Sequence, residues 1–70
     1  MKMIISGQFI TIGQLLKKFG YVSTGGQVKH FLQSNIIKIN GKIPQGRNSK
    51  VFVDSTLWIN DELFKVINES

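Results

Sequence analysis

Seventy residues predict a single domain over residues 1–70 with a small hydrophobic core, and the absence of cysteine excludes disulfides and thiolate zinc sites. The formal net charge is +5, and of the nine Lys and Arg residues only Lys65 lies beyond residue 50, whereas all four acids do. A basic segment of fifty residues without a carboxylate favours a polyanionic partner. The apolar runs are too short for a signal peptide or a membrane span, so we expect a cytoplasmic monomer that does not contact membranes.

The first helix is predicted to begin after a short strand at Met3–Ile5. Thr11 is a suitable N-cap and Gln14 lies three residues later, which is the spacing of a capping box. The apolar residues follow the period of one helix face, and Gly20 is a typical C-terminal stop; they are Ile12, Leu15, Leu16 and Phe19. Lys17 and Lys18 fall on the opposite, solvated face.

A second helix is predicted to begin after Thr24, with Gln27 as the partner in a second capping box. Its first turn contains Gly25 and Gly26, which leave the backbone open to a bulky ligand. The free N–H groups and the positive dipole end of a helix start attract anions, and Lys29, one turn later, can reach the same phosphate. The sequence therefore predicts a phosphate-binding helix start.

The second half of the chain is predicted to be a small antiparallel sheet. Alternation indicates a strand at Ile37–Asn40, and Asn40-Gly41 is a strong turn signal. The other expected elements are a return strand from Lys42-Ile43 that Pro44 stops, a polar loop over 45–49, a short strand at Val51–Val53, and a hairpin of 56–59 with 63–67. Two helices followed by a small sheet predict an α+β fold.

The residue inventory does not support an enzyme, a metal site or a cofactor. The only histidine, His30, lies between Lys29 and Phe31 in sequence, with no acid beside it for a catalytic triad. Gly25-Gly26-Gln27 matches the signature tripeptide of peptide-chain release factors, but nothing else of that family is present. Four aromatic residues are candidates for base stacking, namely Tyr21, Phe52, Trp58 and Phe64. Most of them are expected in the core, because so small a domain needs its aromatic residues there, and Tyr21, in the interhelical turn, is the one to test.

The ordered pattern resembles the RNA-binding domain first seen in ribosomal small-subunit protein four, also called the alpha-L motif. The resemblance covers residues 10–67 and rests on Ile12-Gly13-Gln14-Leu15-Leu16, Ser23-Thr24-Gly25-Gly26-Gln27-Val28-Lys29 and Ile37-Lys38-Ile39-Asn40-Gly41. Small stand-alone bacterial proteins of the YaaA-like subgroup are the most similar. The resemblance implies two N-terminal helices packed on a small twisted antiparallel sheet. It also implies binding to structured ribosomal or transfer RNA, in ribosome assembly or translation.

The candidate RNA-binding residues come from two sources. Matching positions of the family carry over Thr24, Gly25, Gly26, Gln27, Lys29, Asn40, Arg47 and Lys50. Local reasoning adds Lys17, Lys18, His30 and Asn48. The chain departs from the subgroup at His30, where a large aromatic residue is usual, and at Asn48, where a cation or glycine is usual.

Two other functions stay open at the level of sequence. One is a helix-turn-helix DNA binder, because two short helices are joined by Gly20-Tyr21-Val22-Ser23. The other is a protein-interaction module that assembles with the ribosome, for which ribosomal proteins are the expected partners. Tighter binding to duplex DNA than to RNA would favour the first, and association insensitive to salt would favour the second.

Overall fold

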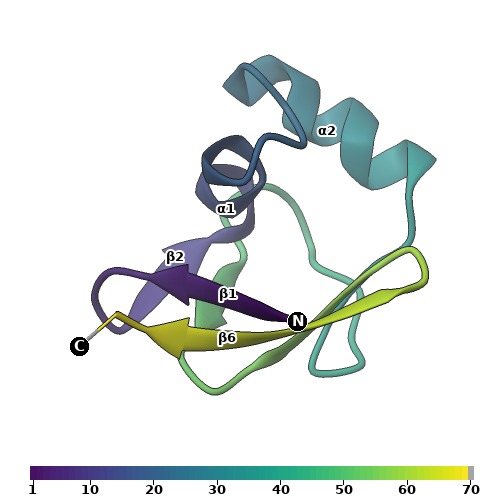
Figure 1. The fold of residues 1–70 in the computed structure, drawn as a ribbon. Coiled ribbons are helices and arrows are strands. Elements are labelled where there is room, and N and C mark those ends of the chain that lie inside the picture. Colours follow the sequence, from purple (N-terminus) through teal and green to yellow (C-terminus); the bar gives the residue numbers. More distant parts are fainter. Residues whose placement is uncertain (70) are drawn as a thin grey trace.

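The computed structural model describes residues 1–69 and has an α+β architecture in which the two helices lie on one side of the strands (Figure 1). The elements in chain order are β1 (Lys2–Ile5), β2 (Phe9–Thr11), α1 (Ile12–Lys18), α2 (Gly25–Ser34), β3 (Ile37–Ile39), β4 (Lys50–Phe52), β5 (Thr56–Ile59) and β6 (Glu62–Asn68). The predicted α+β class is confirmed. The helices are not the N-terminal elements, however, because β1 and β2 precede them.

The main sheet has four strands in the order β1-β6-β5-β3, and a separate two-stranded ribbon pairs β2 with β4. The predicted β5–β6 hairpin is antiparallel, as expected. The return strand predicted at Lys42-Ile43 is reduced to one bridge between Ile39 and Lys42, and β3 pairs antiparallel with β5 instead. The expectation of a purely antiparallel sheet is wrong, because β1 runs parallel to β6 with Met3 opposite Val66. Parallel strands need a long connection, which here is the whole chain between β1 and β6. Such a pair has no local turn signal, so the sequence did not predict it.

The helix starts differ in how they are capped. At α1 the capping box is confirmed: the Gln14 N–H donates to Thr11 Oγ1 at 3.2 Å, and the Thr11 N–H donates to Gln14 Oε1 at 3.5 Å. At α2 the predicted box is wrong, because Thr24 makes no side-chain cap. The Gln27 N–H donates to the Thr24 carbonyl oxygen, and Gln27 Oε1 accepts from the Ser23 N–H at 2.7 Å instead.

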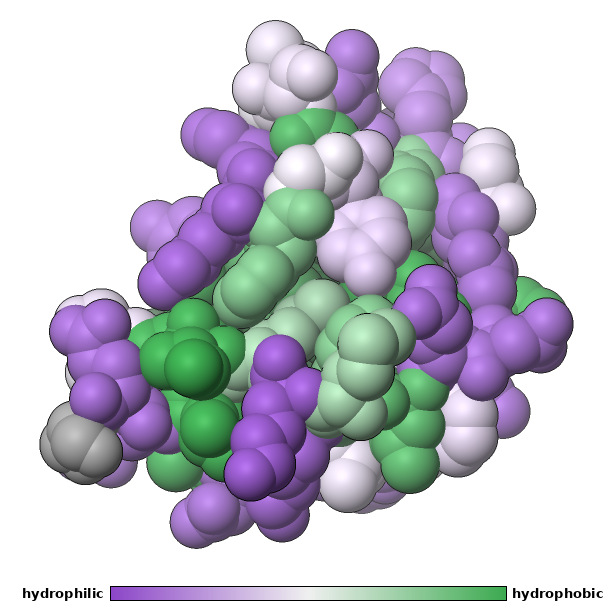
Figure 2. Space-filling model, in the orientation of Figure 1, coloured by the Kyte–Doolittle hydropathy of each residue, from purple (hydrophilic) through white to green (hydrophobic). Residues whose placement is uncertain are grey.

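The core lies between the helices and the inner faces of both sheets. Its buried residues come from alternate positions of the strands and from one face of each helix; they are Met3, Ile5, Ile12, Leu15, Leu16, Val22, Val28, Ile37, Val51, Leu57, Ile59, Phe64 and Val66. In the view from the β1 and β6 side, apolar residues gather over the strands and hydrophilic residues predominate around the border (Figure 2). Of the apolar face predicted for α1, only Phe19 is exposed.

The loop between β3 and β4 is anchored on the first turn of α1. The Ile12 N–H donates to the Ser49 carbonyl oxygen at 2.8 Å, and the Gly13 N–H donates to the Arg47 carbonyl oxygen at 2.9 Å. A Cβ atom at Gly13 would lie 3.1 Å from that Arg47 oxygen and 3.3 Å from Arg47 Cβ. Glycine at this position therefore allows the loop backbone to approach the helix.

Within residues 1–69, no helix is long and apolar enough to cross a membrane. The same residues gather no group of three His, Cys, Asp or Glu side chains that could hold a metal ion.

Asn40 links the β3 turn to β5. It has a positive φ of 53°, its backbone N–H donates to the Thr56 carbonyl oxygen, and its Oδ1 accepts from the Thr56 N–H at 2.9 Å. Its Nδ2 donates to the hydroxyl of buried Ser55 at 3.2 Å. We expect Asn40→Gly, which tolerates the backbone conformation but loses the amide, to lower the free energy of unfolding by about 1–2 kcal/mol in urea denaturation.

Asn40→Ala should lose roughly 1 kcal/mol more, because alanine also resists the left-handed conformation. Asn48→Ala is the matched control: Asn48 is exposed and makes no hydrogen bond within residues 1–69, so its change should stay within about 0.5 kcal/mol. Wild-type stability of Asn40→Gly would show that the side-chain bonds contribute nothing.

Gly13→Val tests the anchoring of the loop. The valine side chain cannot fit against the Arg47 backbone, so we expect the loop to shift and the free energy of unfolding to fall by about 1–3 kcal/mol. Amide hydrogen exchange at Ile12 and at residue 13 should accelerate, because both N–H groups lose their loop acceptors.

The control for Gly13→Val is Lys17→Val, which places the same β-branched residue at an exposed position of the same helix. It should cost only the difference in helix propensity, about 0.5 kcal/mol. Valine is a better helix former than glycine, so propensity would not destabilise Gly13→Val. A loss in Gly13→Val no larger than that in Lys17→Val would therefore contradict the contact with the loop.

Candidate nucleic-acid interface

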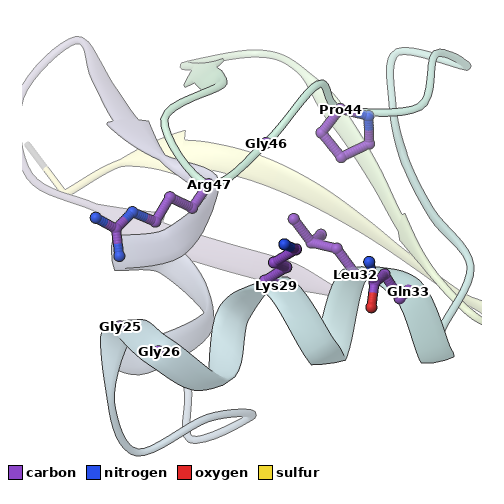
Figure 3. Close-up of a pocket in the computed structure, with 8 residues that line it drawn as sticks. All are labelled: Gly25, Gly26, Lys29, Leu32, Gln33, Pro44, Gly46 and Arg47. Carbon is purple, nitrogen blue, oxygen red and sulfur yellow. The ribbon is translucent and has the colours of Figure 1, made fainter.

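A groove of about 580 Å³ lies between α2 and the loop that precedes β4. Figure 3 shows Lys29 and Leu32 pointing from α2 toward the loop segment that carries Pro44 and Gly46. The remaining lining residues are Gly25, Gly26, Gln33 and Arg47. Four of the predicted site residues, Gly25, Gly26, Lys29 and Arg47, therefore meet in one groove although up to 22 positions separate them (47 − 25).

Arg47 lies at the positive end of α2. Its Nη1 is 3.4 Å from the position that a Cβ atom at Gly25 would occupy. The absence of a side chain at Gly25 therefore leaves open space beside the guanidinium. The first turn of α2 contains no acid, and neither Lys29 nor Arg47 has a recorded ion pair within the described residues. Two positive groups and a helix N-terminus thus share a small region with no counter-charge from the protein.

A second groove of about 250 Å³ continues on the other side of Arg47. It brings in two more predicted residues, Lys17 from α1 and Asn48 from the loop, while Gly25 and Arg47 line both grooves. The other lining residues are Thr11, Gly13, Gln14 and Val28. The two grooves therefore form a surface that runs from α1 across the start of α2, with Arg47 between them.

The N–H groups of the two helix starts are used differently. At α1 the first three are bound to the protein, by Ser49, Arg47 and Thr11. At α2 the N–H groups of Gly25 and Gly26 have no recorded partner within residues 1–69. Only α2 can therefore offer backbone donors to a ligand.

Thr24 and Gln27 flank this helix start and are exposed. The Thr24 hydroxyl makes no cap, so it can contact a ligand. Gln27 is anchored through Oε1 to the Ser23 N–H, which holds its amide beside the first turn. Both predicted residues therefore lie at the edge of the α2 start.

Besides Thr24 and Gln27, four further predicted residues line neither groove. Lys18 and Lys50 lie against aromatic rings, with Lys18 Nζ 5.9 Å from the Phe19 centroid and Lys50 Nζ 4.8 Å from the Phe9 centroid. His30 is exposed on α2. The Asn40 amide is held by Ser55 and Thr56, which gives it a structural role, and its contact with RNA stays a prediction of the resemblance.

Sequence reasoning missed the apolar side of the larger groove. Leu32 was not among the candidate site residues, and Pro44 was expected only to end a strand. The structure brings both to the groove, with Leu32 beside Lys29 on α2 and Pro44 on the facing loop. The segment of Pro44 to Arg47 has no periodicity, so its position next to α2 depends on the loop contacts with α1 and on no local signal.

Tyr21, the predicted stacking residue, is half-buried, and its ring centroid is 5.7 Å from that of Phe31. Burial, and secondarily the negative charge of Glu62, raise the pKa of the Tyr21 hydroxyl above its ordinary value. Phe64 is buried, as expected, whereas Phe52 and Trp58 are exposed. Tyr21 therefore packs at the margin of the core.

Comparison with known proteins gives one family match. The model of the S4 domain matches residues 3–67, which is nearly the whole chain. No curated protein and no solved structure gives a significant match. S4 domains are RNA-binding and non-catalytic, and the YaaA-like subgroup stays a prediction. With this match and with two helices and a mixed sheet compatible with that fold, the chain belongs to the S4 domain family.

Proposed function

We propose that the chain acts as a single non-catalytic domain that grips structured RNA through the two grooves around Arg47. Ribosomal RNA is the first expected target and transfer RNA the second, in ribosome assembly or translation. Membership of the S4 domain family supports RNA as the partner. The choice between these RNAs follows from the resemblance described above.

The observation that carries the proposal is the position of Arg47 at the start of α2. A guanidinium beside the positive end of a helix is electrostatically unfavourable in the free protein, and Lys29 adds a further cation to the same groove. An RNA phosphate removes the conflict, because it accepts hydrogen bonds from the guanidinium and from the Gly25 and Gly26 N–H groups together. The arrangement is therefore favourable only with an anion in place.

The apolar wall of the groove fits a nucleotide better than it fits an isolated anion. Leu32 and Pro44 line the same groove as Lys29 and Arg47. A ribose or base edge can pack on them while its phosphate reaches Arg47 and Lys29. Such contacts recognise the shape of the RNA more than its sequence.

The same geometry argues against a helix-turn-helix function. A recognition helix must expose its N-terminal residues to enter the major groove of DNA. Here the first turn of α2 carries glycines in place of base-reading side chains, and the loop with Pro44 and Gly46 stands opposite its Lys29 face. That loop would meet the DNA backbone before the helix reached the bases.

The double variant Lys29→Ala/Arg47→Ala tests the groove. We expect it to bind folded transfer RNA and a ribosomal RNA fragment at least about tenfold more weakly than the wild type. The slope of log K against log salt should become shallower by roughly 1.5, since each lost phosphate contact removes about 0.7–0.9. Filter binding over a range of salt concentrations measures both quantities, and circular dichroism checks the fold.

The matched control is Lys2→Ala/Lys38→Ala. Both lysines are exposed on the outer face of the four-stranded sheet, since their neighbours Met3 and Ile37 point inward. This control removes the same charge at a distance from the groove and should lose much less affinity. Equal losses in the two variants would refute the groove, and tighter binding to duplex DNA would support the helix-turn-helix alternative.

A further inference from the structure

Two phenylalanines lie on the outside of the β2–β4 ribbon. Phe9 is 43% exposed and Phe52 is 51% exposed, while their neighbours Ile10 and Val51 point toward the core. They are direct cross-strand partners, with ring centroids 5.5 Å apart and an angle of 49° between the planes. A domain this small needs its aromatic residues in the core, so two adjacent exposed rings are a costly arrangement.

A cation lies beside this pair. Lys50 Nζ is 4.8 Å from the Phe9 centroid, within the range of a cation–π contact. Lys50 and Phe52 are two positions apart on β4, and Thr11 and Phe9 are two positions apart on β2, so all four side chains lie on one face of the ribbon. Aromatic surface and positive charge are thus combined on a single face.

The ribbon face continues into the grooves around Arg47. Thr11 is opposite Lys50 in the ribbon and also lines the second groove, together with Lys17, Arg47 and Asn48. The backbone of one RNA strand can therefore contact the cations of the larger groove, then Arg47 and Lys50. Its end then lies over the rings of Phe9 and Phe52. The sequence had indicated Lys50 as an RNA-binding residue and Phe52 as one of four candidate stacking residues, but it did not indicate Phe9 or the pairing of the two rings.

We propose that Phe9 and Phe52 form a stacking site for unpaired RNA bases, with Lys50 contacting the phosphate of the stacked nucleotide. This inference rests on the proposed function, and it adds that the bound RNA has a single-stranded segment next to its structured part. Stacking on aromatic rings requires an unpaired base but accepts any of the four, so the site selects for strand state and not for sequence.

The test uses an RNA hairpin with a short unpaired uridine tail and the same hairpin with a blunt end. Phe9→Leu/Phe52→Leu keeps the apolar character of the ribbon but removes the rings. We expect it to bind the tailed hairpin about tenfold more weakly than the wild type does and the blunt hairpin equally well. The salt slope should become shallower by at most about 0.7–0.9, because only the single phosphate contact of Lys50 depends on the stacked nucleotide.

The matched control is Trp58→Leu, which removes an exposed aromatic ring from the outer face of the four-stranded sheet. It should leave the affinity for both hairpins unchanged. Equal affinity of the phenylalanine double variant and the wild type for the tailed hairpin would overturn the stacking site and reduce the pair to a cross-strand contact that stabilises the ribbon. If Lys29→Ala/Arg47→Ala still weakens RNA binding in that case, the proposed function stands without the stacking site.

Photocrosslinking of the unmodified protein to the tailed hairpin keeps the proposal testable if the double variant fails to fold. Ultraviolet crosslinks of the uridine tail should map to peptides that contain β2 and β4. Crosslinks confined to α2 and the loop before β4 would overturn the stacking site while supporting the grooves, and crosslinks to neither region would contradict both proposals.

Discussion

The contact between the loop backbone and the first turn of α1 is the constraint on which the site depends. Two N–H groups of the helix, from Ile12 and Gly13, hold the carbonyl oxygens of Ser49 and Arg47. This pairing satisfies the helix start and also fixes the loop that forms one wall of each groove. The side chain of Arg47 then extends from an anchored backbone, so binding an anion has to order the side chain but not the loop backbone.

The N-termini of the two helices consequently have different roles. The N-terminus of α1 is closed by the loop and by Thr11, so α1 serves as a support. The N-terminus of α2 stays open at Gly25 and Gly26 and faces Arg47. Glycine weakens a helix, and a cation at its positive end weakens it further. Stability is therefore reduced at the place where an anion would restore it.

Sequence reasoning predicted elements that depend on neighbouring residues and missed those that depend on distant ones. The Thr11–Gln14 capping box, both helices and the β5–β6 hairpin have local signals, and the structure contains them. The parallel β1–β6 pair joins the two ends of the described chain, and β2 is a three-residue strand that β4 completes. The residues of the helix start were predicted by their chemistry, whereas the meeting of Lys29, Pro44 and Arg47 results from the anchored loop.

Two of the four acids, Asp61 and Glu62, lie near the C-terminal end of α2. Asn60, in the β5–β6 turn, exchanges hydrogen bonds with Asn35 and Ile36 just beyond the C-terminus of the helix, which brings the neighbouring Asp61 and Glu62 near that end. Arg47 and the open N–H groups lie at the opposite end. Side-chain charge and helix dipole thus have the same direction along α2, which is unfavourable for the isolated helix. The combined field attracts a polyanion to the N-terminal end and repels it from the C-terminal end, so it orients the protein before contact.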